Sequence, residues 1–543
     1  MLLRLALLGA GFIALAQPQT ADLIVRNARI YTVDAKQPTA SSIAVRGGKI
    51  AAVGGDLKSL EGSSTKVVDA KGAPIIPGLI DSHGHVAGLG ASLEMLDLRG
   101  VTSEAEIAGK VKAAAGKAAP GEWILGRGWD QNLFATKQFP TEASLTTASP
   151  KNPVALTRID GHASWVNRAA IDAADINAGT RDPDGGRIIR DEGGRPTGVL
   201  IDTAQGLVRR KIPPPSPEQV LRQISRALQE CARLGLTSVH DAGVNEAEIA
   251  AYHTLVQQGK MPIRVYAMLS NQPALIDKWL ARGPEIGEYL TIRSIKAYAD
   301  GALGSRGAAL LAPYADEKSQ SGLMITGEKA IQDVAVKAAA RGFQVNTHAI
   351  GDRGNHETLA AYAVALKGPN DKRFRIEHAQ VIAPQDFVKF KNFSVIASVQ
   401  PTHATSDMGW AADRLGPERV KGAYAWQTLM KLGVHLASGS DFPVELPNPI
   451  DGFYAAITRE DKNGSPRGGW FPDQRLSREE ALRSWTLEGA YAAFEENGKG
   501  SLTPGRLADF IMLSGDIMTI PPADILRTKV TMTVVGGKIV FQE

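Results

Sequence analysis

Hydrophobic and polar residues alternate in short runs at both ends of the chain, which predicts β-strands. Near the N-terminus these runs lie within residues 22–53 and are interrupted by Gly47-Gly48. Near the C-terminus they lie within residues 508–541 and are interrupted by Gly536-Gly537. Paired glycines between strand-like runs indicate tight hairpin turns. Because both ends have the same pattern of short strand-like runs interrupted by paired glycines, we expect the two ends to pair with each other.

Between the two ends, strand-like apolar runs alternate with segments of helical periodicity, as in parallel α/β architectures. Eight such runs occur, and eight parallel strands close a barrel. The predicted strands cover residues 77–81, 237–240, 264–269, 291–299, 343–348, 374–378, 394–399 and 434–438. Predicted helices cover residues 217–235, 328–341, 355–366, 384–390 and 424–432. The sequence therefore predicts a (β/α)8 barrel.

The segment of about residues 90–217 does not fit a single strand and helix, and it contains turn-rich stretches such as residues 182–186. We interpret it as an insertion after the first barrel strand. Loops that follow barrel strands rise from the face that carries active sites. The insertion is therefore expected to cover a pocket on that face.

Composition and charge narrow the class of protein. Hydrophobic residues make up 43% and charged residues 22% of the chain, which is typical of a soluble globular protein and argues against general disorder. A net charge of +4 over 543 residues, without a long basic run, gives little attraction for nucleic acid. The one cysteine, Cys231, excludes an intramolecular disulfide and falls in a helical pattern that predicts a buried thiol.

The first residues resemble a signal peptide. Arg4 precedes an apolar run over residues 5–15, and Ala14-Leu15-Ala16 has the small-x-small form of a cleavage site. The run is shorter than the roughly 20 residues that span a bilayer. We predict that residues 1–16 are a signal peptide, that the protein is exported to the periplasm or secreted, and that it has no stable membrane insertion after cleavage.

Six residues of metal-ligand type stand at or just past the ends of predicted strands. In a closed parallel barrel all strand C-termini open on one face, so these residues are expected to converge on one pocket that binds cations. The six are His83, His85, Lys296, His348, His378 and Asp441.

The individual signals differ in strength. His83 and His85 lie on the same side of an extended chain and can grip one divalent cation, although a surface histidine pair is the alternative. A lone strand-end histidine such as His348 or His378 is more often structural, but the set in barrel order favours a metal site.

Asp441 can ligate a metal and accept a proton, or can act as a turn or N-cap residue. Lys296 is a cation in an apolar strand, which is costly unless it is paired or deprotonated.

At this point the chain resembles the amidohydrolase superfamily. The resemblance rests on Gly78-Leu-Ile-Asp-Ser-His83-Gly-His85, the strand lysine, the two later histidines and Asp441. Four further stretches resemble amidohydrolase family 3, which includes N-substituted formamide deformylases. They are Gly126-Arg-Gly-Trp-Asp130, Asp160-Gly-His162, Ala299-Asp-Gly-Ala-Leu-Gly-Ser-Arg306 and Pro504-Gly-Arg-Leu-Ala-Asp509.

The resemblance implies a distorted (β/α)8 TIM barrel over residues 73–499, with a small β-sandwich domain built from residues 21–72 and 500–543. It also implies two divalent metal ions. His83, His85 and Asp441 would hold the first, His348 and His378 the second, and Lys296, carboxylated by CO2, would bridge them. The alternative for Lys296 is an unmodified ion pair. Zinc is the expected metal, although manganese, iron or cobalt also suit these ligands.

The implied chemistry is hydrolysis by a metal-bound hydroxide that attacks a polarised carbonyl. Asp441 would collect the proton of the shared water and pass it to the departing nitrogen. Five residues are candidates for substrate binding: Trp129, Asp160, His162, Arg306 and His403. The alternatives are loop packing for the two histidines, core packing for Trp129 and a surface ion pair for Arg306.

These observations predict an exported, metal-dependent hydrolase that cleaves a non-peptide C–N bond, of the N-substituted amide or formamide type, in a small-molecule substrate. One alternative is a mononuclear metal-dependent deaminase or cyclic-amide hydrolase. Another is a metal-binding scaffold without catalysis, which the complete set of expected ligands argues against. A homo-oligomer is compatible with the sequence.

Overall fold

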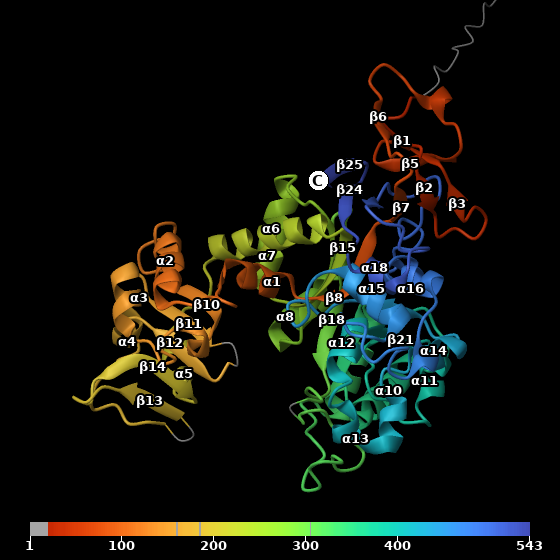
Figure 1. Ribbon diagram of the computed structural model, residues 1–543. Helices are drawn as coiled ribbons and strands as arrows, with labels where there is room; N and C mark the ends of the chain where they lie inside the picture. The colour runs from red at the N-terminus through yellow and green to blue at the C-terminus, as the bar shows by residue number, and fades with distance from the viewer. Residues whose placement is uncertain (1–19, 159–160, 184–185, 305) are drawn as a thin grey trace, which may run out of the picture. The chain divides into compact units, whose positions relative to one another are not determined.

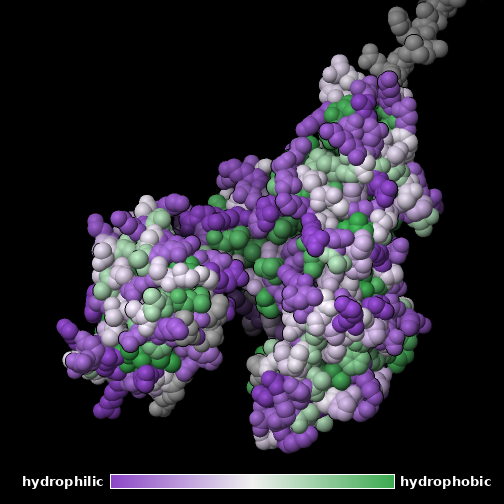
Figure 2. Space-filling model, in the orientation of Figure 1, coloured by the Kyte–Doolittle hydropathy of each residue, from purple (hydrophilic) through white to green (hydrophobic). Residues whose placement is uncertain are grey.

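The computed structural model describes residues 20–158, 161–183, 186–304 and 306–543 (Figure 1). The predicted signal peptide, residues 1–16, lies outside the described residues. The chain divides into two compact units: Val86–Ala227 forms one, and the residues up to His85 together with Leu228–Glu543 form the other. Within the described ranges, every helix is too short or too polar to cross a bilayer. Figure 2 shows hydrophilic residues over much of the visible face of each unit.

The larger unit contains a nearly closed barrel of eight parallel strands, which confirms the predicted fold. Each strand pairs with the next along the chain, and every predicted strand is present. At the seam, the Asp441 amide donates to the His83 carbonyl (2.7 Å) and the His85 amide donates to the Phe442 carbonyl (2.8 Å). The strands are β8 (Leu79–Gly84), β15 (Leu236–Val244), β16 (Arg264–Ser270), β18 (Leu290–Tyr298), β19 (Gln344–Ala349), β20 (Arg375–His378), β21 (Ile396–Val399) and β22 (Leu436–Ser438).

Helices lie between and after these strands (Figure 1). The helix expected at residues 384–390 begins later, at Phe387, because the preceding residues form a turn in which the Asp386 amide donates to the Ala383 carbonyl (2.8 Å). The main helices are α6 (Pro217–Arg233), α7 (Glu246–Gln257), α8 (Pro273–Arg282), α9 (Glu328–Ala340), α10 (Asp352–Leu366), α11 (Phe387–Asn392), α12 (Pro401–Asp407), α13 (Ala411–Arg419), α14 (Trp426–Lys431), α15 (Pro449–Thr458), α16 (Arg478–Ser484), α17 (Leu487–Ala492) and α18 (Pro522–Ile525).

Two sheets form the β-sandwich of the same unit, and one of them joins strands from both chain ends, as predicted. One sheet has the order β5-β4-β1-β6 and the other β25-β24-β23-β7-β2-β3. The two ends meet where β7 pairs antiparallel with β23. Their common core includes Val25, Val45, Phe510 and Val534. The strands are β1 (Leu23–Arg26), β2 (Arg29–Tyr31), β3 (Thr39–Ala40), β4 (Ser42–Arg46), β5 (Lys49–Gly54), β6 (Lys66–Asp69), β7 (Pro74–Pro77), β23 (Phe510–Leu513), β24 (Val530–Val535) and β25 (Lys538–Gln542).

The predicted hairpin turns are confirmed by the backbone. Gly47 and Gly48 have φ of 57° and 74°, and Gly536 and Gly537 have φ of 55° and 75°. A two-residue hairpin turn of this kind needs positive φ at both central positions, which glycine adopts without steric cost.

A buried ion pair joins the sandwich to the barrel. Arg264 of β16 donates to both carboxylate oxygens of Asp509, at 2.8 and 3.0 Å, and both side chains are 3% exposed. The carboxylate also accepts the amide of Gly536 at 2.7 Å. Asp509 thus connects the base of the barrel with the C-terminal hairpin.

We expect the Asp509→Ala variant to lose about 3–5 kcal/mol in its free energy of unfolding, because the change leaves a buried guanidinium without its carboxylate. Urea unfolding monitored by tryptophan fluorescence measures this loss. The matched control is Glu288→Gln, since Glu288 lies 3.6 Å from Arg264 but is 66% exposed, and its loss should cost at most about 1 kcal/mol. Equal losses in the free energy of unfolding of the two variants would contradict the stabilising role of the buried Arg264–Asp509 ion pair.

The smaller unit is the expected insertion after the first barrel strand, and it is built on a mixed six-stranded sheet of order β13-β14-β12-β11-β10-β9. One core cluster contains Trp129, Leu156 and Trp165, and a second contains Val166 and Val208. Whether the unit covers the barrel pocket stays a prediction. Its elements are α1 (Val86–Glu94), β9 (Leu96–Asp97), α2 (Glu104–Ala115), β10 (Ile124–Trp129), α3 (Glu142–Ala148), β11 (Val154–Arg158), β12 (Ala163–Val166), α4 (Arg168–Ala173), β13 (Gly186–Arg190), β14 (Pro196–Asp202) and α5 (Gln205–Arg209).

Candidate metal centre

The six predicted ligands occupy the C-terminal ends of barrel strands. His83 lies in β8 and His85 directly follows it, Lys296 lies in β18 and His348 in β19. His378 is the last residue of β20, and Asp441 follows β22. Because the strands are parallel, these positions share one end of the barrel.

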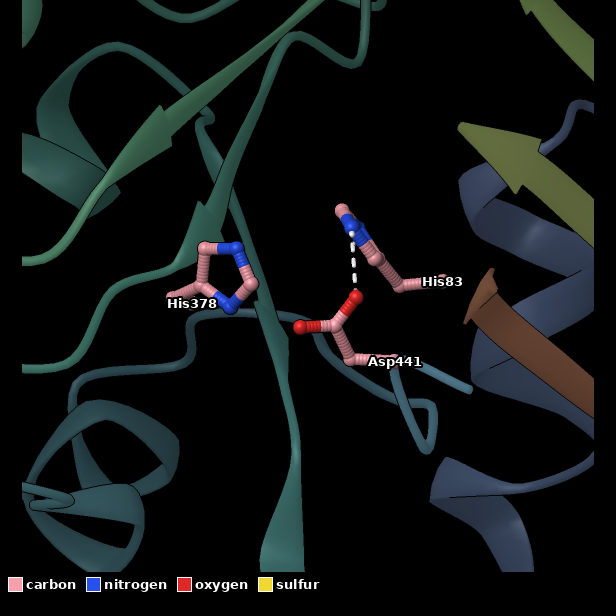
Figure 3. Close-up of side chains that lie close together, drawn as sticks. All are labelled: His83, His378 and Asp441. Atoms are coloured by element: carbon pink, nitrogen blue, oxygen red, sulfur yellow. Dashed lines mark ion pairs between the residues drawn. The ribbon is translucent and has the colours of Figure 1, made fainter. Parts of the chain in front are cut away.

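The side chains converge there. The ligand atoms of His83, His378 and Asp441 all lie within 4.8 Å of one another, and the three side chains point toward a common space (Figure 3). His85 Nε2 lies 3.1 Å from Asp441 Oδ1, and Lys296 Nζ lies 3.0 Å from His83 Nε2. The His348 ring is centred 4.5 Å from the ring of His378. The structure therefore brings together all six residues that the sequence singles out.

Three of the imidazoles are held by the ring nitrogen that faces away from the cluster. His83 Nδ1 lies 2.5 Å from a carboxylate oxygen of Glu377, and His378 Nδ1 lies 2.7 Å from Gln400 Oε1. His85 Nδ1 lies 2.8 Å from the Ala242 carbonyl oxygen. Since all three partners are oxygen acceptors, each Nδ1 carries a hydrogen. When such a ring is neutral, its Nε2 keeps the lone pair that binds a metal ion.

An unpartnered buried atom fits the same interpretation. Among the described residues, His348 Nε2 is buried without a hydrogen-bond partner. A buried acceptor that lacks a partner costs about 1–3 kcal/mol, so such atoms are retained where a bound group satisfies them. Neutral imidazoles and a carboxylate in one buried cluster are a donor set that suits zinc and related divalent cations.

Burial controls the protonation of the cluster. It lowers the pKa of His348 to about 3, with a further contribution from the Lys296 cation, and it also lowers the pKa values of His83 and His378. These imidazoles are therefore neutral at pH 7. Burial opposes ionisation of Asp441, but a hydrogen bond from His85 holds the pKa of that carboxyl well below its usual range. Burial in turn lowers the pKa of His85, but Asp441 raises it above its ordinary value.

Lys296 is buried, and burial lowers the pKa of its amine to about 8, against the opposing charges of Glu377 and Asp441. The amine is therefore much easier to deprotonate than an exposed lysine. At pH 7 the amine is still mainly a cation, and the carboxylates of Glu377 and Asp441 supply the opposing charges that offset the cost of burying it.

Two residues that support the centre were missed by sequence reasoning. Glu377, which is fully buried, holds His83, and Gln400, which is 3% exposed, holds His378. Burial alone would raise the pKa of Glu377, but His83, Arg375 and Lys296 lower it to about 2. The available signal was a glutamate directly before a predicted ligand inside a predicted strand.

The predicted substrate-binding residues of the larger unit have different surroundings. His403 of α12 stacks on His378 with ring centroids 6.0 Å apart, and its buried Nε2 lies 3.8 Å from Asp441 Oδ2. Arg306 pairs with Asp316 at 3.0 Å, and Asp316 also binds Arg414. Arg306 thus forms the ion pair that was its alternative, and its anion-binding role stays a prediction.

The other candidates belong to the insertion. His162 is 75% exposed and its Nδ1 lies 2.7 Å from Asp202 Oδ1. Trp129 is fully buried in the core of that unit and donates its indole N–H to the Leu156 carbonyl. A substrate-binding role for Trp129 is therefore corrected to core packing, because no face of the ring is left for a ligand. Asp160 lies outside the described residues.

A parallel barrel with neutral imidazoles, a carboxylate and a lysine at its strand ends defines a metal-dependent hydrolase. The sequence pattern of the amidohydrolase family matches residues 66–541, and the chain belongs to this family. The resemblance found from the motifs is thereby confirmed.

Individual relatives agree with this assignment. The chain is 36% identical to the protein LONG AFTER FAR-RED 3 of Arabidopsis thaliana, over 96% of this chain and 92% of the relative. It is 25% identical to the N-substituted formamide deformylase of Arthrobacter pascens, over 96% and 99% of the two chains. Among solved structures, a metal-dependent hydrolase of Pyrococcus furiosus shares 30% identity at a TM-score of 0.77, covering 92% of this chain and all of the other.

Proposed function

We propose that this metal-dependent hydrolase cleaves a non-peptide C–N bond in a small N-substituted amide or formamide. The observation that carries the proposal is the convergence of His83, His378 and Asp441 at the open end of the barrel, with neutral imidazoles presenting Nε2 to one space. The full-length similarity to an N-substituted formamide deformylase supports the substrate class.

As the family resemblance implies, we propose that the donor atoms serve two cations. His83, His85 and Asp441 would hold one, and His348 and His378 the other. Lys296 would bridge them after carboxylation by CO2, which adds only to a free amine. Its pKa of about 8 makes that form more accessible than in an exposed lysine. When bound, divalent cations polarise a carbonyl oxygen and lower the pKa of a coordinated water. Zinc is the metal we propose.

Asp441 is proposed as the group that moves the proton. Its Oδ1 lies beside His85 Nε2, while its Oδ2 lies on the side of His403. A carboxylate in this position can take a proton from the attacking water and give it to the departing nitrogen, so one side chain serves both halves of the reaction.

His403 is proposed to hold the substrate. Its Nε2 is buried beside the proposed ligands and has no hydrogen-bond partner in the described part of the chain. An N–H at this position can donate to the carbonyl oxygen of a bound amide and stabilise the charge that develops there.

Export is part of the proposal. Residues 1–16 have the form of a cleavable signal peptide. Mass spectrometry of the mature protein from the periplasm or culture medium is expected to show an N-terminus just after Ala16. Retention of residues 1–16 in the cytoplasm would contradict export.

A substrate panel tests the proposed reaction. The protein is loaded with zinc or manganese and given N-substituted formamides, N-substituted acetamides, a cyclic amide, an aminated heterocycle and a dipeptide. We expect amine and carboxylic acid in equal amounts from at least one N-substituted amide. Ammonia from the heterocycle alone would favour the deaminase alternative, and inertness toward the whole panel would favour the non-catalytic scaffold.

A further inference from the structure

Two buried charged groups inside the barrel have no part in the proposed chemistry. Glu377 and Arg375 are both fully buried in β20, two residues apart and therefore on the same side of the strand. TIM barrel interiors are normally filled by branched apolar side chains. A carboxylate and a guanidinium in this layer require a specific reason, because burying charge is costly.

The contacts of Glu377 show what it does. One carboxylate oxygen lies 2.5 Å from His83 Nδ1, and the other lies 3.9 Å from the Arg375 guanidinium. Arg375 in turn donates to the Ala492 carbonyl at 2.5 Å and lies 3.0 Å from His240 Nδ1. Among the described residues, Glu377 is the only side chain within hydrogen-bond distance of His83 Nδ1.

His83 differs from the other proposed ligands in this respect. The Nδ1 atoms of His85 and His378 are held by neutral oxygens, a backbone carbonyl and an amide, whereas that of His83 is held by a carboxylate. A carboxylate acceptor makes a shorter and stronger hydrogen bond, fixes the ring orientation and increases the basicity of the opposite nitrogen.

We propose that Glu377 is a positioning residue of the metal centre, which holds His83 as the Nδ1–H tautomer so that Nε2 is a strong and fixed ligand atom. The Arg375 guanidinium, 3.9 Å from the other carboxylate oxygen, places an opposite charge beside it. This inference rests on the proposed metal site, and it adds a residue that touches neither metal nor substrate.

Two substitutions of Glu377 are expected to weaken the metal site to different degrees. Glutamine at position 377 keeps an oxygen acceptor for Nδ1–H but loses the negative charge, whereas alanine loses both. We therefore expect zinc affinity to decrease in the order wild type, Glu377→Gln, Glu377→Ala, with a loss of about 10- to 100-fold for alanine, as is typical when an outer partner of a ligand histidine is removed.

The matched control is Asp386→Asn. Asp386 is fully buried and lies 3.0 Å from His356 Nδ1, so this change also replaces a carboxylate by an amide next to an imidazole. His356 lies in α10 and is not among the proposed ligands. The zinc affinity of the Asp386→Asn variant is expected to equal that of the wild type.

Two measurements on the full-length protein decide the question. Competition with a chelator of known affinity gives the zinc affinity, after urea unfolding has shown which variants fold. NMR of the metal-free protein labelled with 15N-histidine, with His83 assigned by the His83→Asn variant, is expected to show a strongly hydrogen-bonded Nδ1–H signal that is weakened in Glu377→Gln and lost in Glu377→Ala.

Equal zinc affinities in the wild type and the folded position-377 variants, or an unchanged His83 signal, would overturn the inference. If Glu377→Ala does not fold, the glutamine variant carries the test alone. Failure of the proposed function is a separate result: a wild-type protein that binds no cation would refute the metal site, while the NMR signal would still test the role of Glu377 in the metal-free chain.

Discussion

The Asp441→Asn variant is expected to lose about 10²- to 10⁴-fold in kcat on whichever amide the protein hydrolyses, because it removes the proposed proton carrier. Asparagine has the same shape but cannot accept a proton at neutral pH. The native carboxylate accepts a hydrogen bond from His85 Nε2 at 3.1 Å. Steady-state kinetics at saturating metal, together with metal content, measure the effect.

The control for this change is Asp277→Asn on α8, where the side chain is exposed and distant in sequence from every proposed ligand. It should keep the wild-type rate. Both variants should retain the wild-type circular dichroism spectrum. An Asp441→Asn variant with the wild-type kcat would show that another group carries the proton and that the proposed site is wrong.

The Lys296→Met variant is expected to bind at most one cation per chain where the wild type binds two, and to lose more than about 100-fold in kcat/KM. Methionine fills a similar volume in the apolar strand, so folding should persist, but it cannot form a carbamate. Loss of a bridging ligand should cost at least as much as the 10- to 100-fold that follows loss of an outer-shell partner. Metal analysis after removal of loosely bound ions measures the stoichiometry.

Bicarbonate provides an independent control for this prediction. Wild-type protein stripped with chelator and kept free of CO2 should recover two cations per chain only when bicarbonate is supplied with metal. Lys278→Met, on an exposed residue of α8 that pairs with Glu246, should behave as the wild type in every step. A stoichiometry fixed at one cation with and without bicarbonate would contradict the bridge.

The barrel and the proposed ligands could be predicted from the sequence because both depend on local patterns. Apolar runs such as residues 265–269 in β16 and residues 395–397 at β21 are continuous, since parallel strands are covered on both faces. His83, Lys296, His348 and Asp441 stand at or just past the ends of predicted strands, and parallel topology alone brings them to one end of the barrel. The paired glycines of the two hairpins likewise reported their turns directly.

Partners set by distant contacts could not be predicted in the same way. Glu377 binds His83 across 294 positions of sequence, and no local pattern shows which buried charge meets which ligand. Its neighbour His378 has a positive φ of 74°, which breaks the simple alternation of sides at the strand end. The role of Trp129 was predicted wrongly because local sequence does not distinguish a tryptophan in a core from one in a pocket. The role of Arg306 was left open because local sequence does not distinguish a paired arginine from an unpaired one.

The most direct test of the account is a crystal structure of the protein grown with zinc and bicarbonate, with anomalous scattering recorded at the zinc edge. The account predicts two anomalous peaks between His83, His85, His348, His378 and Asp441, with carbamate density on Lys296 between them. A crystal in which zinc binds elsewhere, with no peak in reach of His83, His378 and Asp441, would contradict it.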